Sequence, residues 1–271
     1  MVYVYKSLVM PRSSATPKPL SQAVLSKYPH DRYISIQEAG RSFVGDSAVF
    51  LSIPRYLLIS LNNPLSAECI KSLRAGLVVV KLVGNDEKSD QEVNNLKLIQ
   101  ATNATGRYAG IHSRFPVVGP YDDLWFELSA LEPSLTLSFF INSIKKNSNS
   151  LPSEFVAHVF LELLSPIEFS HTDCRLTHGD LHSGKIMFDL RRCQNDAPKT
   201  LPNLVLIDFG VSVPFDEEGG LEDVRMFCSV FSELSKMKCV DESSTWNISK
   251  FLSFCGDVAE MRMVSPADWL I

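Results

Sequence analysis

The chain has 271 residues, of which 45% are hydrophobic, so it is long enough to bury a substantial core as one two-lobed domain or two small ones. Its net charge of −5 excludes a general basic field, and nucleic acid is therefore not expected as a partner. No apolar run reaches the length of about 18 residues that a membrane helix needs, so no membrane association is expected. The six cysteines are scattered without a C-x-x-C pair, which favours reduced thiols and an intracellular, cytoplasmic location over a disulfide scaffold.

Residues 1–32 are expected to form a flexible leader, because residues 11–20 are rich in proline and serine. The following region is predicted to be rich in strands. Short apolar runs next to turn residues predict β-strands over Tyr33–Ile36, Ala48–Ile53, Tyr56–Leu61, Leu77–Val83, Phe115–Gly119 and Asp123–Leu128. Two helices are expected between these strands, a short one over Ser66–Arg74 and a longer one from Ser89 to about Ala101.

After about Ser129 the pattern becomes helical. Helices are predicted over Leu135–Ile144 and Ser153–Phe169, and the second carries one apolar stripe made of Phe155, Val159, Leu163 and Ile167. The chain therefore divides into a strand-rich part, residues 33–128, and a helix-rich part, residues 129–271. This order predicts an α+β fold.

Two segments of the helix-rich part resemble motifs of the protein-kinase superfamily. Leu176–Met187 contains His-Gly-Asp-Leu-His and resembles the catalytic loop of that family, in the form found in its atypical members. Val205–Gly210 ends in Asp-Phe-Gly and resembles the metal-binding turn. The resemblance implies a two-lobed protein-kinase-like fold, with a β-rich N-lobe and a small helical C-lobe. It also implies that Asp180 is the catalytic base, that Asp208 binds Mg²⁺ and that ATP is the phosphoryl donor.

The strand-rich part supplies the rest of an ATP site in this resemblance. Lys81 in Val-Val-Val-Lys-Leu resembles the strand lysine that contacts the α- and β-phosphates and acts in catalysis, and Glu92 resembles the helix glutamate that holds this lysine. The segment Gly40-Arg-Ser-Phe-Val-Gly45 resembles the glycine-rich loop with serine at the middle position, and the hinge to adenine is expected over Leu128–Leu131. The residues expected to bind ATP are therefore Gly40, Ser42, Gly45, Lys81, Glu92, Leu128 and Leu131.

Two positions of the predicted catalytic loop depart from the family pattern. Lys185 stands where an asparagine would ligate a second metal ion; an ammonium group only donates hydrogen bonds and repels cations, so this metal position is expected to be lost. One hypothesis is that the charge of Lys185 replaces that metal near the γ-phosphate. Gly179 replaces the arginine before the catalytic aspartate, so loop phosphorylation is not expected to activate the protein. Asp223 resembles the helix aspartate that braces the catalytic loop.

Three functions are compatible with this pattern. Intact Lys81, Asp180 and Asp208 favour an atypical Ser/Thr protein kinase with a protein substrate. Lys185 and Ser42 favour a catalytically impaired pseudokinase that acts as a binding or scaffold protein. A small-molecule phosphotransferase is the third reading, although the region after Asp208 lacks the extra helical insertions that would build a pocket for a small substrate.

Overall fold

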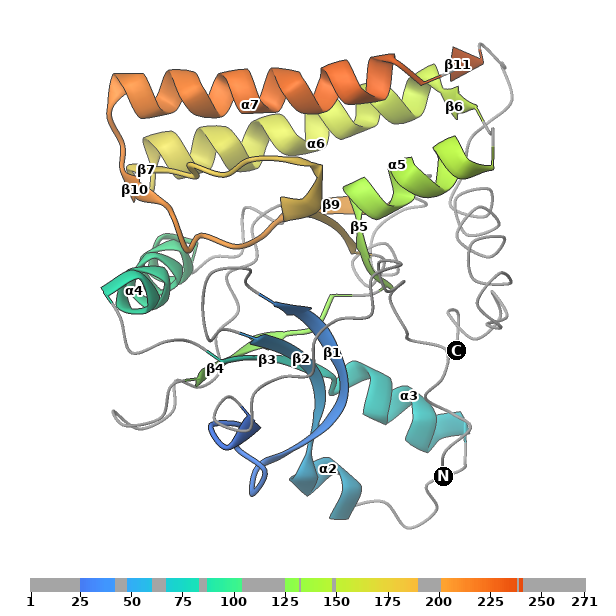
Figure 1. Cartoon of the computed structure of the whole chain (residues 1–271), viewed down its shortest axis with the longest axis vertical. Coiled ribbons are helices and arrows are strands. Elements are labelled where there is room, and N and C mark those ends of the chain that lie inside the picture. Colours follow the sequence, from blue (N-terminus) through green and yellow to red (C-terminus); the bar gives the residue numbers. More distant parts are fainter. Residues whose placement is uncertain are drawn as a thin grey trace. The chain divides into compact units, whose positions relative to one another are not determined.

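The fold is described from a computed structural model (Figure 1). The structure describes residues 25–41, 48–59, 67–82, 87–103, 125–131, 133–147, 150–189, 201–237 and 239–240. These residues belong to two compact units: the first lies within Met1–Ser89 and Arg114–Ala130, and the second within Asp90–Ser113 and Leu131–Met261. Both units combine helices with antiparallel strands, which confirms the α+β prediction. No helix in the described part of the chain is both long and apolar enough to cross a membrane.

The first unit contains a four-stranded antiparallel sheet. Its strands follow the order β1 (Tyr33–Arg41), β2 (Ala48–Pro54), β3 (Val78–Leu82) and β4 (Trp125–Ser129). Side chains alternate along β2 and β3, so the sheet buries two apolar faces. One face includes Tyr33, Phe50, Val80 and Leu82. The other includes Leu51 and Ile53, which cluster with the helix residue Leu73. The α-helices α2 (Arg55–Ile59) and α3 (Ala67–Ala75) lie between β2 and β3 in the chain.

Part of the leader expected from the sequence instead packs on this sheet. The Tyr28 side chain is buried, donates a hydrogen bond of 2.8 Å to the Ser52 hydroxyl, and meets the Phe50 ring edge to face at 5.1 Å. A backbone hydrogen bond of 3.0 Å from Tyr33 to Pro29 turns the chain into β1. A buried aromatic residue with a satisfied hydroxyl stabilises this segment, which the proline-rich composition upstream did not indicate.

The strand predicted over Tyr56–Leu61 is wrong. Strand β2 ends at Pro54 and the chain continues as helix α2. The Arg55 N–H still donates to Arg32 O at 2.8 Å, one residue beyond the β1–β2 pairing, and the Arg55 guanidinium donates to His30 O at 2.6 Å. A short apolar run carries no period that separates a strand from a helix, which explains the error.

The second unit is built around two long helices, α6 (Ser153–Thr172) and α7 (Glu217–Ser235), which lie side by side in Figure 1. Phe160 of α6 packs against Phe227 and Phe231 of α7, with ring centroids 5.4 and 5.1 Å apart. Helix α5 (Leu137–Lys146) begins two residues later than predicted, because Thr136 caps it by accepting a hydrogen bond from the Phe139 N–H. Helix α4 (Glu87–Thr102) joins this unit from Asp90 onward.

Short strands connect the helices of the second unit. A three-stranded antiparallel sheet has the order β5 (Pro133–Thr136), β8 (Ile186–Asp189), β9 (Asn203–Leu206). Two pairs complete the unit: β7 (Leu176–Thr177) with β10 (Val213–Pro214), antiparallel, and β6 (Leu151–Pro152) with β11 (Cys239–Val240), parallel. The rings of Phe140, Phe155 and Phe188 form the core between this sheet and the helices.

A buried carboxyl group in the first unit makes its stability depend on pH. Glu127 of β4 accepts a hydrogen bond from the Tyr33 hydroxyl. Burial raises the pKa of the Glu127 carboxyl above its ordinary value, although the Tyr33 hydrogen bond partly offsets this effect. The folded protein therefore retains this proton to a higher pH than the unfolded chain, and stability falls as the pH rises above the ordinary value of 4.5.

We predict that Glu127→Gln reduces the loss of thermal stability between about pH 5 and pH 7.5, because the amide accepts the Tyr33 hydrogen bond without ionising. The melting temperature at pH 7.5 should equal or exceed that of the parent. The matched control is Asp31→Asn, whose carboxyl group is exposed. A lower melting temperature at pH 7.5 with an unchanged pH dependence contradicts the prediction.

Candidate active site

Strand pairing in the second unit brings the two predicted motifs together. Strands β8 and β9 pair antiparallel with Ile186 opposite Leu206, so the residue before β8 meets the residues that follow β9. The Ile207 N–H donates to the Lys185 carbonyl at 3.0 Å and continues this pairing by one bond. Lys185 and Asp208, which are 23 positions apart in the sequence, therefore lie next to each other.

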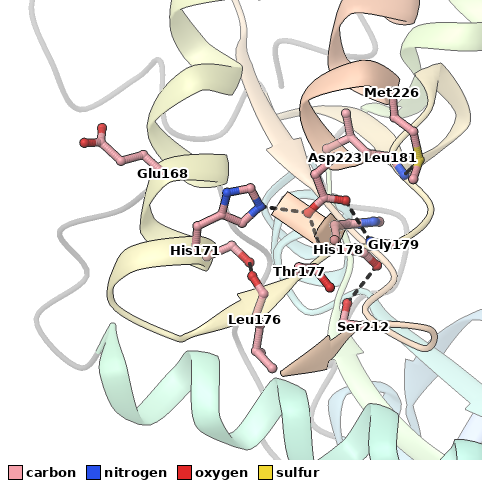
Figure 2. Close-up of polar contacts among 12 residues, drawn as sticks. Glu168, His171, Leu176, Thr177, His178, Gly179, Leu181, Ser212, Asp223 and Met226 are labelled. Carbon is pink, nitrogen blue, oxygen red and sulfur yellow. Dashed lines mark hydrogen bonds and ion pairs between the residues drawn. The ribbon is translucent and has the colours of Figure 1, made fainter. Parts of the chain in front are cut away.

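The buried carboxylate of Asp223 holds the backbone of the predicted catalytic loop, as Figure 2 shows. It accepts hydrogen bonds from the backbone N–H of His178 at 2.7 Å and of Gly179 at 2.9 Å. The His171 ring nitrogen Nε2, from helix α6, contacts the same carboxylate at 2.8 Å. Burial alone would raise the pKa of the Asp223 carboxyl, but these bonds more than offset burial and lower it. The predicted bracing role of Asp223 is confirmed.

His178 links the loop to the Asp-Phe-Gly turn. Its ring lies 5.0 Å from the Phe209 ring, centroid to centroid, and its Nε2 is 3.0 Å from the Ile207 carbonyl. Its Nδ1 accepts a hydrogen bond of 3.3 Å from the Asp180 N–H. Burial lowers the pKa of His178, and one donating and one accepting ring nitrogen suit a neutral imidazole. The ring therefore ties the backbone of Asp180 to the segment that carries Asp208.

Two residues of this region have a left-handed backbone. Gly179 has φ of +76°, and a Cβ atom there would lie 3.1 Å from the Val211 carbonyl oxygen, so both conformation and space favour glycine. Asp208 has φ of +67°, which is uncommon for a residue with a side chain. Such strained positions persist where the surrounding structure holds them, and they cluster at functional sites. Asp208 is held in this way between strand β9 and the turn that follows.

The ammonium group of Lys185 lies between the carboxylates of Asp180, the predicted base, and Asp208, the predicted metal ligand. It donates a hydrogen bond to Asp208 Oδ2, and it is 3.3 Å from Asp180 Oδ2. Burial alone would lower the pKa of Lys185, but the hydrogen bond and charge of Asp208, together with Asp180, more than offset burial and raise it. The Asp180 side chain is 45% exposed, so solvent or a substrate can reach it. His182 Nε2 lies 3.8 Å from its other oxygen.

Helix α4 contacts the turn after Asp208 through polar side chains. Asn95 donates to the carbonyl oxygens of Phe209 at 3.2 Å and Ser212 at 2.9 Å, and Gln91 donates to Ser212 at 2.5 Å. Glu92 is buried, and its carboxylate lies beside Gly210. A Cβ atom added to Gly210 would be 3.2 Å from Glu92 Oε2. Glycine at this position therefore leaves room for the carboxylate of α4.

The other predicted ATP-binding residues are distributed over the two units. Lys81 lies on β3 of the first unit, with its ammonium 5.9 Å from the centre of the Phe126 ring. Leu128 lies on β4 and pairs with Val79 of β3, and Gly40 lies near the end of β1. Leu131 is buried in the second unit, whereas Ser42 and Gly45 lie outside the described residues. The pairing of Lys81 with Glu92 and the ATP contacts of these residues stay predictions.

The residues around Asp208 fit a magnesium ion poorly. Both carboxylates direct an oxygen atom at the same ammonium group, which occupies the place of a cation shared between them. Magnesium prefers oxygen ligands in octahedral geometry, and Lys185 supplies only donors. No group of three or more His, Cys, Asp or Glu side chains suited to a metal ion occurs among the described residues.

Several contacts of the site have no signal in the sequence. His171 reaches Asp223 across 52 positions, and the Ser212 hydroxyl donates to the His178 carbonyl at 3.0 Å across 34. Glu233 of α7 accepts hydrogen bonds from Ser183 at 2.9 Å and from Lys145 at 3.2 Å, which fixes the turn before Lys185. For Asn95 the sequence does carry a signal: it lies about one helical turn after Glu92, so both side chains are on the same face of α4.

No protein-family model matches the sequence, and no curated protein matches it. The chemistry of the site is therefore the basis for assigning a function.

We predict that Asp223→Asn destabilises the protein by about 1–3 kcal/mol, because an amide turns an NH₂ group toward a backbone N–H or His171 and leaves a buried donor without an acceptor. Chemical denaturation measures this loss. Glu222→Gln is the matched control, since the Glu222 carboxylate lies on the same helix but is exposed and pairs with Arg225. Equal stability of the two variants contradicts the bracing role assigned to the Asp223 carboxylate.

Proposed function

We propose that the protein is a two-lobed, protein-kinase-like ATP-binding phosphotransferase. In this proposal Asp180 accepts the proton of a serine or threonine hydroxyl on a protein substrate as that oxygen attacks the γ-phosphorus of ATP. The observation that carries the proposal is the convergence of Asp180, Lys185 and Asp208 on one partly exposed point of the second unit. The order of motifs in the sequence supports the same reading.

The surroundings of Asp180 suit a general base. Its side chain is accessible, it carries a carboxylate that can accept a hydroxyl proton, and its backbone is fixed through His178 to a buried aspartate. Phosphoryl transfer depends mainly on positioning and on neutralising negative charge. A rigidly placed base beside a lysine ammonium meets both needs.

The same contacts also favour the second candidate, a catalytically impaired pseudokinase that binds a partner protein. Lys185 already pairs with both Asp180 and Asp208. The ion pair with Lys185 occupies one oxygen of the Asp180 carboxylate, so the ammonium competes with a substrate hydroxyl for it. In that case the braced loop would be kept as a scaffold, with or without bound nucleotide.

We predict that ATP raises the melting temperature of the purified protein and that the protein transfers the labelled γ-phosphate of ATP to a Ser/Thr peptide library. Asp180→Asn should lower the rate by about 100-fold or more while leaving the ATP-induced shift in place, because a neutral amide accepts no proton. Glu222→Gln, an exposed carboxylate on α7, should match the parent in both assays.

The outcomes separate the candidates. A thermal shift with ATP but no transfer to any peptide assigns the pseudokinase function. Transfer that Asp180→Asn does not reduce contradicts the role given to Asp180. No shift with ATP, for a protein shown to be folded, contradicts the proposed nucleotide site.

A further inference from the structure

The cation between the Asp180 and Asp208 carboxylates is the side chain of Lys185. The Lys185 side chain is mostly buried, with 21% of its surface exposed, and its ammonium lies within ion-pair distance of one oxygen of each carboxylate. Its backbone is held at the start of β8 by the hydrogen bond from Ile207 and by the η2 turn (Ser183–Lys185). Because the ammonium is covalently attached next to the carboxylates, it binds them without the loss of translational entropy that a dissolved ion pays on binding.

The Lys185 ammonium and a divalent metal ion would compete for the position between the two carboxylates. Two carboxylates and one ammonium sum to one negative charge, and a divalent cation placed between the carboxylates would meet the ammonium at close range. The ion would have to displace Lys185 from Asp208. An ammonium and a metal ion cannot share the same carboxylate oxygen without strong repulsion, so the two compete for one position.

Lys185 also has a donor to offer to a bound anion. An ammonium group has three N–H donors, and Asp208 and Asp180 account for two of them. The third can bond an oxygen of a phosphate group. Lysine acts in phosphate sites as a point charge, and this is the role that a metal ion takes between a carboxylate and a phosphate.

We propose that Lys185 is the resident cation of this site and that the protein binds a nucleoside triphosphate there without a divalent metal ion. The part concerning the nucleotide rests on the function proposed above, whereas the exclusion of the metal ion from Asp180 and Asp208 does not. The two parts are therefore tested by separate measurements.

The first measurement uses Mn²⁺ alone, followed by its electron paramagnetic resonance signal, with no nucleotide present. The parent protein should bind Mn²⁺ only weakly between Asp180 and Asp208, and its affinity is the reference for the variants. Lys185→Asn, which removes the ammonium and adds an amide oxygen, should bind Mn²⁺ about tenfold more tightly or better. Lys185→Arg should behave as the parent because it keeps the positive charge, and Asp208→Asn added to Lys185→Asn should abolish the new site. Lys146→Asn, an exposed lysine of α5, is the control.

The second measurement is a calorimetric titration of the parent protein with ATP, once in excess EDTA and once in Mg²⁺. Affinity in EDTA should equal or exceed that in Mg²⁺. Lys185→Asn should reverse this preference, since its site would need the metal ion for charge. Circular dichroism and the melting temperature of each variant confirm folding, and the parent titration alone decides the question if a variant does not fold.

Each outcome has one meaning. Mn²⁺ binding by the parent as tight as by Lys185→Asn overturns the assignment of Lys185 as the resident cation. ATP binding by the parent that requires Mg²⁺ overturns it as well while leaving the proposed nucleotide site intact. No ATP binding in either buffer overturns the proposed nucleotide site, and the Mn²⁺ measurement then still decides whether Lys185 excludes a metal ion.

Discussion

The buried carboxylate of Asp223 is the interaction on which the rest of the site depends. It is fully buried and satisfies two backbone N–H groups of the loop and one ring nitrogen of α6. Removing any of these partners would leave a charge or a donor without compensation in the protein interior, which is costly. The carboxylate therefore fixes the conformation of His178 and Gly179, and through the His178 ring it fixes the backbone of Asp180 and the strand that leads to Asp208.

This support also sets the surroundings of Lys185. The His178 backbone bonds to the buried Asp223, and the His178 ring contacts the Ile207 carbonyl next to Asp208, whose backbone is left-handed. The Lys185 ammonium lies between the Asp180 and Asp208 carboxylates. In the function proposed above, the Lys185–Asp208 pair would provide an internal positive charge beside the predicted base.

The sequence predicted the elements with clear periodicity and the motif residues of the loop. Strand β3, helices α4 and α6, and the bracing role of Asp223 followed from patterns or from the family resemblance. Tyr56–Leu61 was predicted as a strand because a short apolar run fits either structure, whereas the chain forms helix α2 after β2 ends at Pro54. The ion pair between Lys185 and Asp208 could not be predicted, because it depends on the register of β8 with β9.

Nitrogen-15 NMR of the lysine side chains tests the central claim most directly, because an ammonium group held between two carboxylates gives a signal that reports on the ions next to it. The Lys185→Arg variant assigns the Lys185 signal by its loss. The account predicts that ATP added without any divalent metal ion shifts the Lys185 signal, and that Mg²⁺ added without nucleotide leaves it unchanged. A Lys185 signal that ATP does not shift, or that Mg²⁺ alone displaces, would contradict it.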